Sequence, residues 1–318
     1  MHPAKSVIYF TTATGAGYGL FIWLAVLAFM GILPTDQTFS FAALFLGFGL
    51  VISGLLSSTF HLGHPERAWR AFSQWRSSWL SREGVMAILT FIPLSVFAIK
   101  WFFGGQTDGL AQTLIIIGAV MSLFTVFTTS MIYASLKAIP AWHNVWTKAG
   151  YIVLCLMSGA LLALALCTIF DYKDQAYHLF LPALVLLMLG GLTKIMYWRH
   201  IQVGKRVSTA ESATGLGQFG KVTMAASPHG EDNYLLKEMG FKIARKHARK
   251  IRRITSVCAF ILPFVLIAIG MHQYNDTVRL ITILAAAIIC GLGLVFERWL
   301  FFAEAKHVVT LYYGESEI

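Results

Sequence analysis

Eight long apolar stretches constrain this chain of 318 residues more than any other feature. A helix needs roughly 20 apolar residues to cross the hydrocarbon of a bilayer. Strands of a membrane barrel would instead alternate in polarity over roughly ten residues. The sequence therefore predicts an all-α integral membrane bundle of eight transmembrane helices, at about residues 6–33, 40–60, 83–103, 110–136, 149–170, 177–198, 255–273 and 277–303.

The composition agrees with this fold class, because 57% of the residues are hydrophobic and 13% are charged. Soluble domains of this length are rarely so apolar. Outside the apolar windows the longest polar segment is the loop 199–254, which is short for a separate catalytic domain. The first window is too long for the apolar core of a signal peptide. We therefore expect a single membrane domain over residues 1–318.

Basic residues are distributed unequally between the two ends of the predicted bundle. Of the 25 Lys and Arg residues, only Lys100, Lys173 and Arg279 lie at one end. The other 22 lie at the end that holds both termini, and Lys and Arg mark the cytoplasmic side of a membrane protein. We therefore expect cytoplasmic termini and a cytoplasmic 199–254 loop. The net charge of +10 follows from this topology and does not indicate nucleic-acid binding.

The two halves of the 199–254 loop differ. Small residues dominate 208–217, which we interpret as a flexible strap that is a poor helix former and binds a partner. Residues 233–255 form a predicted helix that continues into the seventh span and carries eight Lys or Arg residues. That helix either lies on anionic lipid headgroups or forms a docking surface for a cytoplasmic subunit.

An ionisable cluster lies between the second and third apolar windows. It includes His61, His64, Arg67 and, a few residues later, Glu83. Ionisable groups beside lipid are costly unless they are solvated, paired or functional. Imidazole and a desolvated carboxyl suit proton exchange near neutral pH, which quinone reduction requires. We predict that these four residues bind a quinone (ubiquinone or menaquinone); the structural alternative is a capped helix end whose arginines hold lipid phosphates.

Other cofactors find little support in the sequence. All four cysteines lie inside apolar windows and none forms a CxxC pair, so no iron–sulfur cluster is predicted in this chain. No two histidines stand out inside two spans, so we expect no haem, and no compact His/Cys set predicts a metal site. In the last window, Glu297 either pairs with Arg298 or a basic loop residue, or it belongs to a proton path.

Several motifs resemble those of DMSO reductase anchor subunits. Residues 61–68, His-Leu-Gly-His-Pro-Glu-Arg-Ala, are similar to the HLG-x-P-x-RA signature of that family. Residues 81–83, Ser-Arg-Glu, resemble the segment that opens its third helix, and residues 140–147 resemble its PxW-x-x-x-WT loop. Glu297 also has a counterpart in that family. The sequence of the long loop is similar to that of sulfite dehydrogenase anchors, in the segments Ser-Ala-Thr-Gly-Leu-Gly at 212–217 and Asn-Tyr-Leu-Leu-Lys-Glu-Met-Gly-Phe at 233–241.

The resemblance implies a function. Such anchors hold a four-cluster iron–sulfur subunit and a molybdopterin catalytic subunit on a bacterial inner membrane, and they exchange electrons with quinone. His61 and Glu83 match the family's quinol-site histidine and acid. In DMSO reductase the partners face the periplasm, whereas the charge distribution here predicts partners on the cytoplasmic side. The resemblance therefore favours a sulfite-oxidising, quinone-reducing complex in which this anchor holds the quinone site but not the substrate chemistry.

Three alternatives remain open at this stage. In the first, the protein is the anchor of a DMSO- or polysulfide-type reductase that takes electrons from quinol. From another class, it is a small-anion transporter, although no paired broken helices near the midplane support this. Finally, it is a structural tether whose loop residues only cap helices.

Overall fold

The computed structural model describes residues 4–60, 64–203, 208–226 and 243–318. Within these ranges eight helices are long and apolar enough to cross a membrane, which confirms the predicted fold class. The helical elements that make these spans are α1 Lys5–Phe29, α2 Gln37–Thr59, α3 Trp79–Gly104, α4 Gly109–Ala134, α5 Val145–Ile169, α6 Lys173–Val203, α9 Ile243–Ser256 continuing into α10 Leu262–Met271, and α11 Asp276–Ala303.

The seventh span is interrupted by a π-helical turn, η3 Val257–Ile261, between α9 and α10. Proline has no N–H, so Pro263 cannot donate to the carbonyl of Ala259 one turn earlier. The thiol of Cys290 on α11 donates to that carbonyl instead, at 3.4 Å. The predicted helix over 233–255 is confirmed from residue 243 onward, and residues 233–242 lie outside the described part of the chain.

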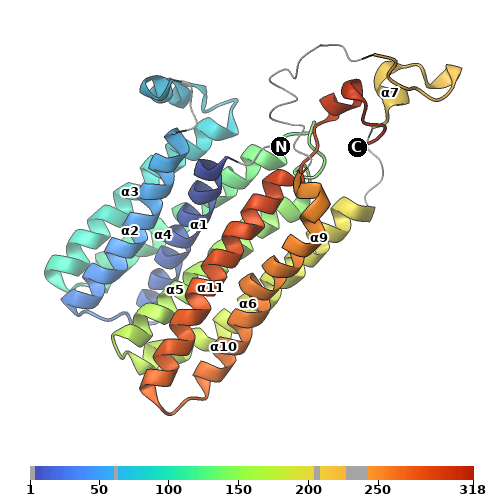
Figure 1. The fold of residues 1–318 in the computed structure, drawn as a ribbon. Coiled ribbons are helices and arrows are strands. Elements are labelled where there is room, and N and C mark those ends of the chain that lie inside the picture. The colour runs from blue at the N-terminus through green and yellow to red at the C-terminus, as the bar shows by residue number, and fades with distance from the viewer. Residues whose placement is uncertain (1–3, 61–63, 204–207, 227–242) are drawn as a thin grey trace.

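Two helices form the inside of the bundle. Some 61% of the apolar window of α1 and 67% of that of α5 are buried, against at most 39% for the other spans. α1 packs against α2, α4, α5 and α11 (Figure 1). The crossing of α1 and α5 needs glycine on both sides, because a Cβ at Gly19 would lie 2.1 Å from the Cys155 carbonyl oxygen and one at Gly159 would meet the backbone of Gly19.

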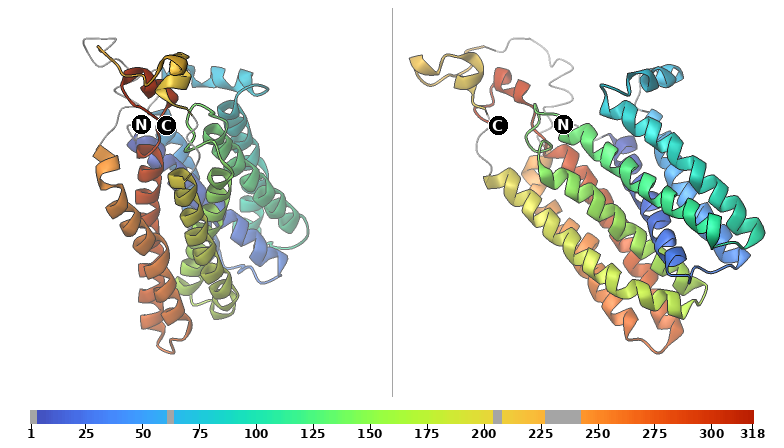
Figure 2. Two further views of the ribbon diagram at one scale, coloured as in Figure 1. Left: turned by 90° about the vertical axis from the view of Figure 1, so that its right-hand side faces the viewer. Right: turned by 180° about the vertical axis from the view of Figure 1, so that it is seen from behind.

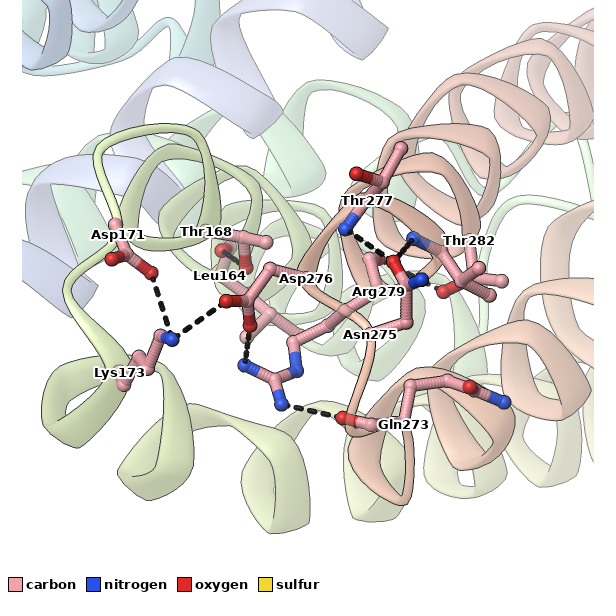
Figure 3. A network of polar contacts seen from close by, with 11 residues as sticks. Leu164, Thr168, Asp171, Lys173, Gln273, Asn275, Asp276, Thr277, Arg279 and Thr282 are labelled. Carbon is pink, nitrogen blue, oxygen red and sulfur yellow. Dashed lines mark hydrogen bonds and ion pairs between the residues drawn. The ribbon is translucent and has the colours of Figure 1, made fainter.

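Both termini lie at the same end of the bundle, as Figures 1 and 2 show. At the opposite end, short turns join the helices, and Figure 3 shows the contacts that hold two of them together. Lys173 at the start of α6 pairs with Asp276 at the start of α11 at 2.8 Å. Asp276 also pairs with Arg279 at 3.0 Å, and Asn275 caps α11 by accepting backbone N–H bonds. The turns are therefore fixed by polar contacts between neighbouring helices.

The described part of the long loop departs from the prediction of a strap that is a poor helix former. Residues Ala210–Thr214 form a short helix, α7, because the Thr209 hydroxyl accepts the Ser212 N–H and the Ser212 hydroxyl accepts the Thr209 N–H. Ser208 and Ile318 exchange backbone hydrogen bonds at 3.0 and 3.4 Å. This segment thus packs on the C-terminal segment of its own chain. Two 3₁₀ turns, η2 Gly217–Phe219 and η4 Val308–Tyr313, belong to the same two segments.

Candidate quinone site

A 3₁₀ helix, η1 Pro65–Gln74, lies across the start of α3. Two side chains from the first turn of α3 hold it there. The Ser81 hydroxyl donates to the carbonyl of Ala71, and the Arg82 guanidinium donates to the carbonyl of Trp75 at 3.0 Å. η1 therefore forms a polar cover over the loop end of α3.

Glycine at position 84 lets this cover lie close to the helix. A Cβ added at Gly84 would stand 2.7 Å from the ring of Phe72 in η1. Phe72 therefore packs against α3 at Gly84, the residue that follows Glu83. The local sequence thus positions Glu83 directly beneath η1.

Beneath η1 the structure has a cavity of about 770 Å³. Its volume lies in the range of small-molecule sites, which are mostly apolar with a few polar groups. His64, Arg67 and Glu83 all line it, so the structure brings together three of the four predicted site residues. His61, the fourth, lies outside the described residues. The remaining lining comes from η1 and the ends of five helices: Ala4, Val7, Phe10, Leu55, Ser58, Thr59, Ala68, Ala71, Phe72, Leu80, Gly84, Ala87, Ile88, Phe91, Ile132, Tyr133 and Phe302.

The three ionisable residues occupy different depths. Glu83 is only 6% exposed, and its carboxyl lies within hydrogen-bonding reach of the Thr129 side chain on α4. His64 and Arg67 are exposed, and both contact Glu66, at 3.1 and 3.7 Å. The cavity therefore has a buried carboxyl in its wall and a solvated, charged mouth.

Tyr133 is a lining residue that the sequence analysis missed. It is 9% exposed and lies in an aromatic cluster, with ring centroids 5.3 Å from Trp142 and 5.8 Å from Tyr151. A tyrosine at helical spacing in an apolar window has the pattern of an ordinary packing residue. Its ring contacts Phe301 and Phe302 of α11, at centroid distances of 5.7 and 5.2 Å, and this tertiary packing brings it into the cavity wall.

Residues 140–147 form a structural corner. The indole N–H of Trp142 donates to the carbonyl of Phe301 on α11 at 3.0 Å, and Trp142 is 2% exposed. The His143 ring donates to the carbonyl of Ala134 at 2.6 Å. Asn144 caps α5. These bonds fix α11 against the turn between α4 and α5.

A second ionisable cluster lies inside the bundle, away from the cavity. The Glu297 carboxylate contacts the Lys194 ammonium at 2.5 Å and the Arg298 guanidinium at 3.1 Å. All three residues are buried. The sequence offered the pairing of Glu297 with Arg298 as one of two alternatives. It did not predict the contact with Lys194. The presence of a lysine inside the apolar window 177–198 could have indicated it. Glu297 is an ion-paired residue in the packed interior.

At the loop end of α11, Arg252 and Glu304 form a further pair at 2.7 Å. Burial raises the pKa of the Glu304 carboxyl above its ordinary value, and the neighbouring Arg252 opposes that shift. This pair is more exposed than the Lys194–Glu297–Arg298 cluster and lies at the edge of the bundle.

A small polar cavity of about 20 Å³ lies between the two ionisable regions. Thr129 and Arg298 both line it, together with Tyr151 and Ser158. Its volume suffices for about one water molecule. In the part of the chain that the structure describes, no group of three or more His, Cys, Asp or Glu side chains is arranged to hold a metal ion.

The eight spans and the cavity at their loop end define a multi-pass membrane protein with a ligand-sized, ionisable pocket at one membrane boundary. The chain belongs to the DMSO reductase anchor subunit (DmsC) family, which it matches over residues 1–314.

The similarity to known proteins extends over nearly the whole chain in one case and over about half of it in others. A sulfite dehydrogenase subunit from Allochromatium vinosum is 32% identical over 98% of this chain and 99% of its own length. An anaerobic dimethyl sulfoxide reductase chain from Escherichia coli is 27% identical over 56% of this chain and 63% of its own length. An anaerobic dimethyl sulfoxide reductase chain from Haemophilus influenzae is 22% identical over 56% of this chain and 63% of its own length.

Proposed function

We propose that this chain is the quinone-reactive anchor of a membrane-bound oxidoreductase, and that it passes electrons from sulfite oxidation to quinone. The full-length similarity to a sulfite dehydrogenase subunit supports the choice of sulfite over dimethyl sulfoxide, whose reductase chains match about half of this chain. Oxidation of sulfite to sulfate releases two electrons, and reduction of a quinone to a quinol takes up two electrons and two protons.

The observation that carries the proposal is the cavity beneath η1. Its walls are mostly apolar, as an aromatic quinone ring requires, and its ionisable groups converge from η1 and α3. Bound there, a quinone would supply the two-electron chemistry. The residues of this chain would supply orientation, hydrogen bonds and protons. This combination of apolar walls and a few convergent polar groups is typical of small-molecule sites.

Each polar residue has a role that follows from its depth. Glu83, buried in the cavity wall, would deliver protons at a quinone oxygen. At the exposed mouth, His64 would exchange those protons with water, and Arg67 would hold the polar ring edge. We also assign a hydrogen bond to the second oxygen to His61, on the strength of the family resemblance.

Charge supports a cytoplasmic position for this end of the bundle. At the opposite end, Lys173 and Arg279 are both paired with Asp276, so little unpaired basic charge remains there. At the loop end, Arg249, Lys250 and Arg253 of α9 are exposed. Lys and Arg accumulate on the cytoplasmic side. The iron–sulfur and molybdopterin partners of this anchor, which we take to include a four-cluster subunit, would then be cytoplasmic and the membrane would be the bacterial inner membrane.

A reporter fused after Ile318 tests the orientation. The proposal expects a signal from a cytoplasm-active reporter and none from a periplasm-active one. The reverse pattern would overturn the cytoplasmic position of the partners as well.

The exposed bases of α9 would contact the partner, since complementary charge steers and orients such contacts. Reversing Arg249 and Lys250 to Glu should release the partner subunits from membranes, whereas Lys100→Glu at the opposite end should not. Retention of the partners at ordinary salt concentration would mean that α9 faces lipid headgroups.

The chemical test substitutes the buried carboxyl. Glu83→Gln keeps the size of the side chain but removes its proton chemistry, so quinone-coupled turnover should fall by about 10²-fold or more. Activity with a soluble acceptor that bypasses this subunit should persist. Glu211→Gln, a half-buried carboxyl in α7 that does not line the cavity, is the matched control and should leave both activities unchanged. Equal loss of both activities in Glu83→Gln would indicate misassembly, and loss of neither would place the quinone elsewhere.

A further inference from the structure

The two helices that flank the candidate quinone cavity face each other along a second hollow farther from the loops. This groove has a volume of about 420 Å³. Six residues of α2 between positions 41 and 52 and four residues of α3 between positions 98 and 103 line it, and all of them are apolar. It therefore offers a hydrocarbon surface without polar recognition groups.

The groove and the cavity follow one another along the same seam between α2 and α3. On α2, lining residues recur at 41, 45, 48, 52, 55 and 59, in steps of three and four, which is one face of a helix. On α3 the lining residues include 80, 84, 87 and 91 at the cavity and 98 and 102 at the groove, and none lies between 91 and 98. The rings of Phe48 and Phe91 stack across the seam with centroids 5.7 Å apart, at the point where the cavity meets the groove.

The groove is open on the side that faces lipid. Phe45 is 71% exposed and Phe103 is 77% exposed, so both lie along the outer edge of the groove. A Cβ added at Gly49, which lines the groove, would meet no atom within 4 Å. The helices thus leave a linear apolar hollow beside the lipid.

The length of the seam fits one class of occupant. Glu83 and Ala98 are fifteen residues apart on α3, which corresponds to about 22 Å along a helix. The hydrocarbon core is about 30 Å thick. A molecule whose polar ring is held beside Glu83 and whose long apolar chain runs toward the opposite membrane face would follow this seam for most of its length.

We propose that the seam between α2 and α3 binds the isoprenoid tail of the quinone. This inference rests on the proposed function, because the tail is placed by a ring bound in the cavity. The seam favours long-tailed quinones over analogues that lack a tail, since only the former bury apolar surface along α2 and α3.

Gly49→Phe fills the groove without a clash at its Cβ and tests the proposal in the assembled complex. We expect the KM for a long-tailed quinone to rise by about tenfold, which corresponds to a few displaced methylenes. The KM for a tail-less analogue should not change. Gly291→Phe is the matched control, because a Cβ at this position on α11 also meets no atom within 4 Å. An equal effect of Gly49→Phe on both quinones, or no effect on either, would overturn the assignment.

A binding measurement on the unsubstituted complex tests the proposal even if Gly49→Phe fails to assemble. A quinone that carries a photoreactive group on its tail should crosslink, in the unsubstituted complex, to peptides containing Phe45 or Phe102. Crosslinks confined to other helices would overturn the tail assignment, and would indicate that a lipid acyl chain occupies the seam.

Glu83→Gln distinguishes a failure of the ring site from a failure of the tail site. If it slows turnover with both quinones while Gly49→Phe changes neither KM, the ring site stands and the tail track is wrong. If Glu83→Gln slows neither, the proposed function itself is wrong.

Discussion

Two buried glutamates at the loop end of the bundle differ in their surroundings. Glu297 is 1% exposed and lies between two cations in packed protein, whereas Glu83 is 6% exposed and lines a cavity of about 770 Å³. The carboxylate of Glu297 is occupied by Lys194 and Arg298. Burial alone therefore does not distinguish a functional carboxyl from a structural one. The neighbouring space and the paired charges make that distinction.

The largest expected effect comes from Glu297→Gln. This change leaves Lys194 and Arg298 as two buried cations without their counter-ion, and breaking a buried pair in this way costs about 3–5 kcal/mol. We expect a marked fall in the unfolding temperature of the purified complex in detergent. Lys194→Met is the matched comparison, because it leaves a neutral Glu297–Arg298 pair and should cost less. If Lys194→Met is the more damaging of the two, the charge argument is wrong.

An intermediate case is the pair at the bundle edge, Arg252 with Glu304. Burial already raises the pKa of Glu304, and Arg252→Met would raise it further by removing the nearby cation. A carboxyl whose folded-state pKa is raised contributes stability that is present below its unfolded pKa and is lost as the pH rises through the folded pKa. The variant should therefore lose about 1–3 kcal/mol at neutral pH, the cost of leaving a buried acceptor without its partner, and the difference should shrink in acid. Unfolding temperatures measured across that pH range would check this, and a pH-independent difference would contradict it.

Glu83→Gln should affect stability far less than Glu297→Gln, although the substitution is the same. Among the described residues, no ion pair to Glu83 is lost, and Gln needs less solvation than a carboxylate. We expect a change within about 1 kcal/mol, in either direction. Parallel thermal unfolding of the two variants makes the comparison direct. Similar destabilisation by both would show that Glu83 is a structural residue like Glu297.

The smallest effect is expected for His64→Ala. Its contact with Glu66 lies at the surface, with both side chains more than half exposed, and such pairs contribute about 0–1 kcal/mol. The unfolding temperature should barely change, while quinone-coupled turnover should fall. A large loss of stability would mean that the cavity mouth is held together by this residue.

Local sequence features predicted the spans well, because hydropathy over about 20 residues depends on no distant contact. The grouping of His64, Arg67 and Glu83 was also predictable, since one loop and the first turn of one helix carry all three. Tyr133 and Lys194 were not predictable in their roles. Each became part of its site through helices that are far apart in the sequence, α4 with α11 in one case and α6 with α11 in the other.

The end of the long loop shows a different limit. Small residues at 208–217 predicted a flexible strap, but the Thr209–Ser212 capping box stabilises a helical turn there. The backbone pairing of Ser208 with Ile318 depends on a segment more than 100 residues away. No composition-based argument contains that contact.

The inner position of α1 has a consequence for biogenesis. The indole N–H of Trp23 donates to the carbonyl of Leu156, 133 residues later in the chain. At about 5–20 residues per second, a ribosome needs roughly 7–27 s to make that stretch. During this interval α1 waits in the membrane with α2 but without α5. Its threonines are suited to the delay, because Thr11, Thr12 and Thr14 donate their hydroxyls to carbonyls within α1 itself. Helix α1 can therefore remain in lipid until α5, which it meets at the Gly19–Gly159 crossing, is synthesised.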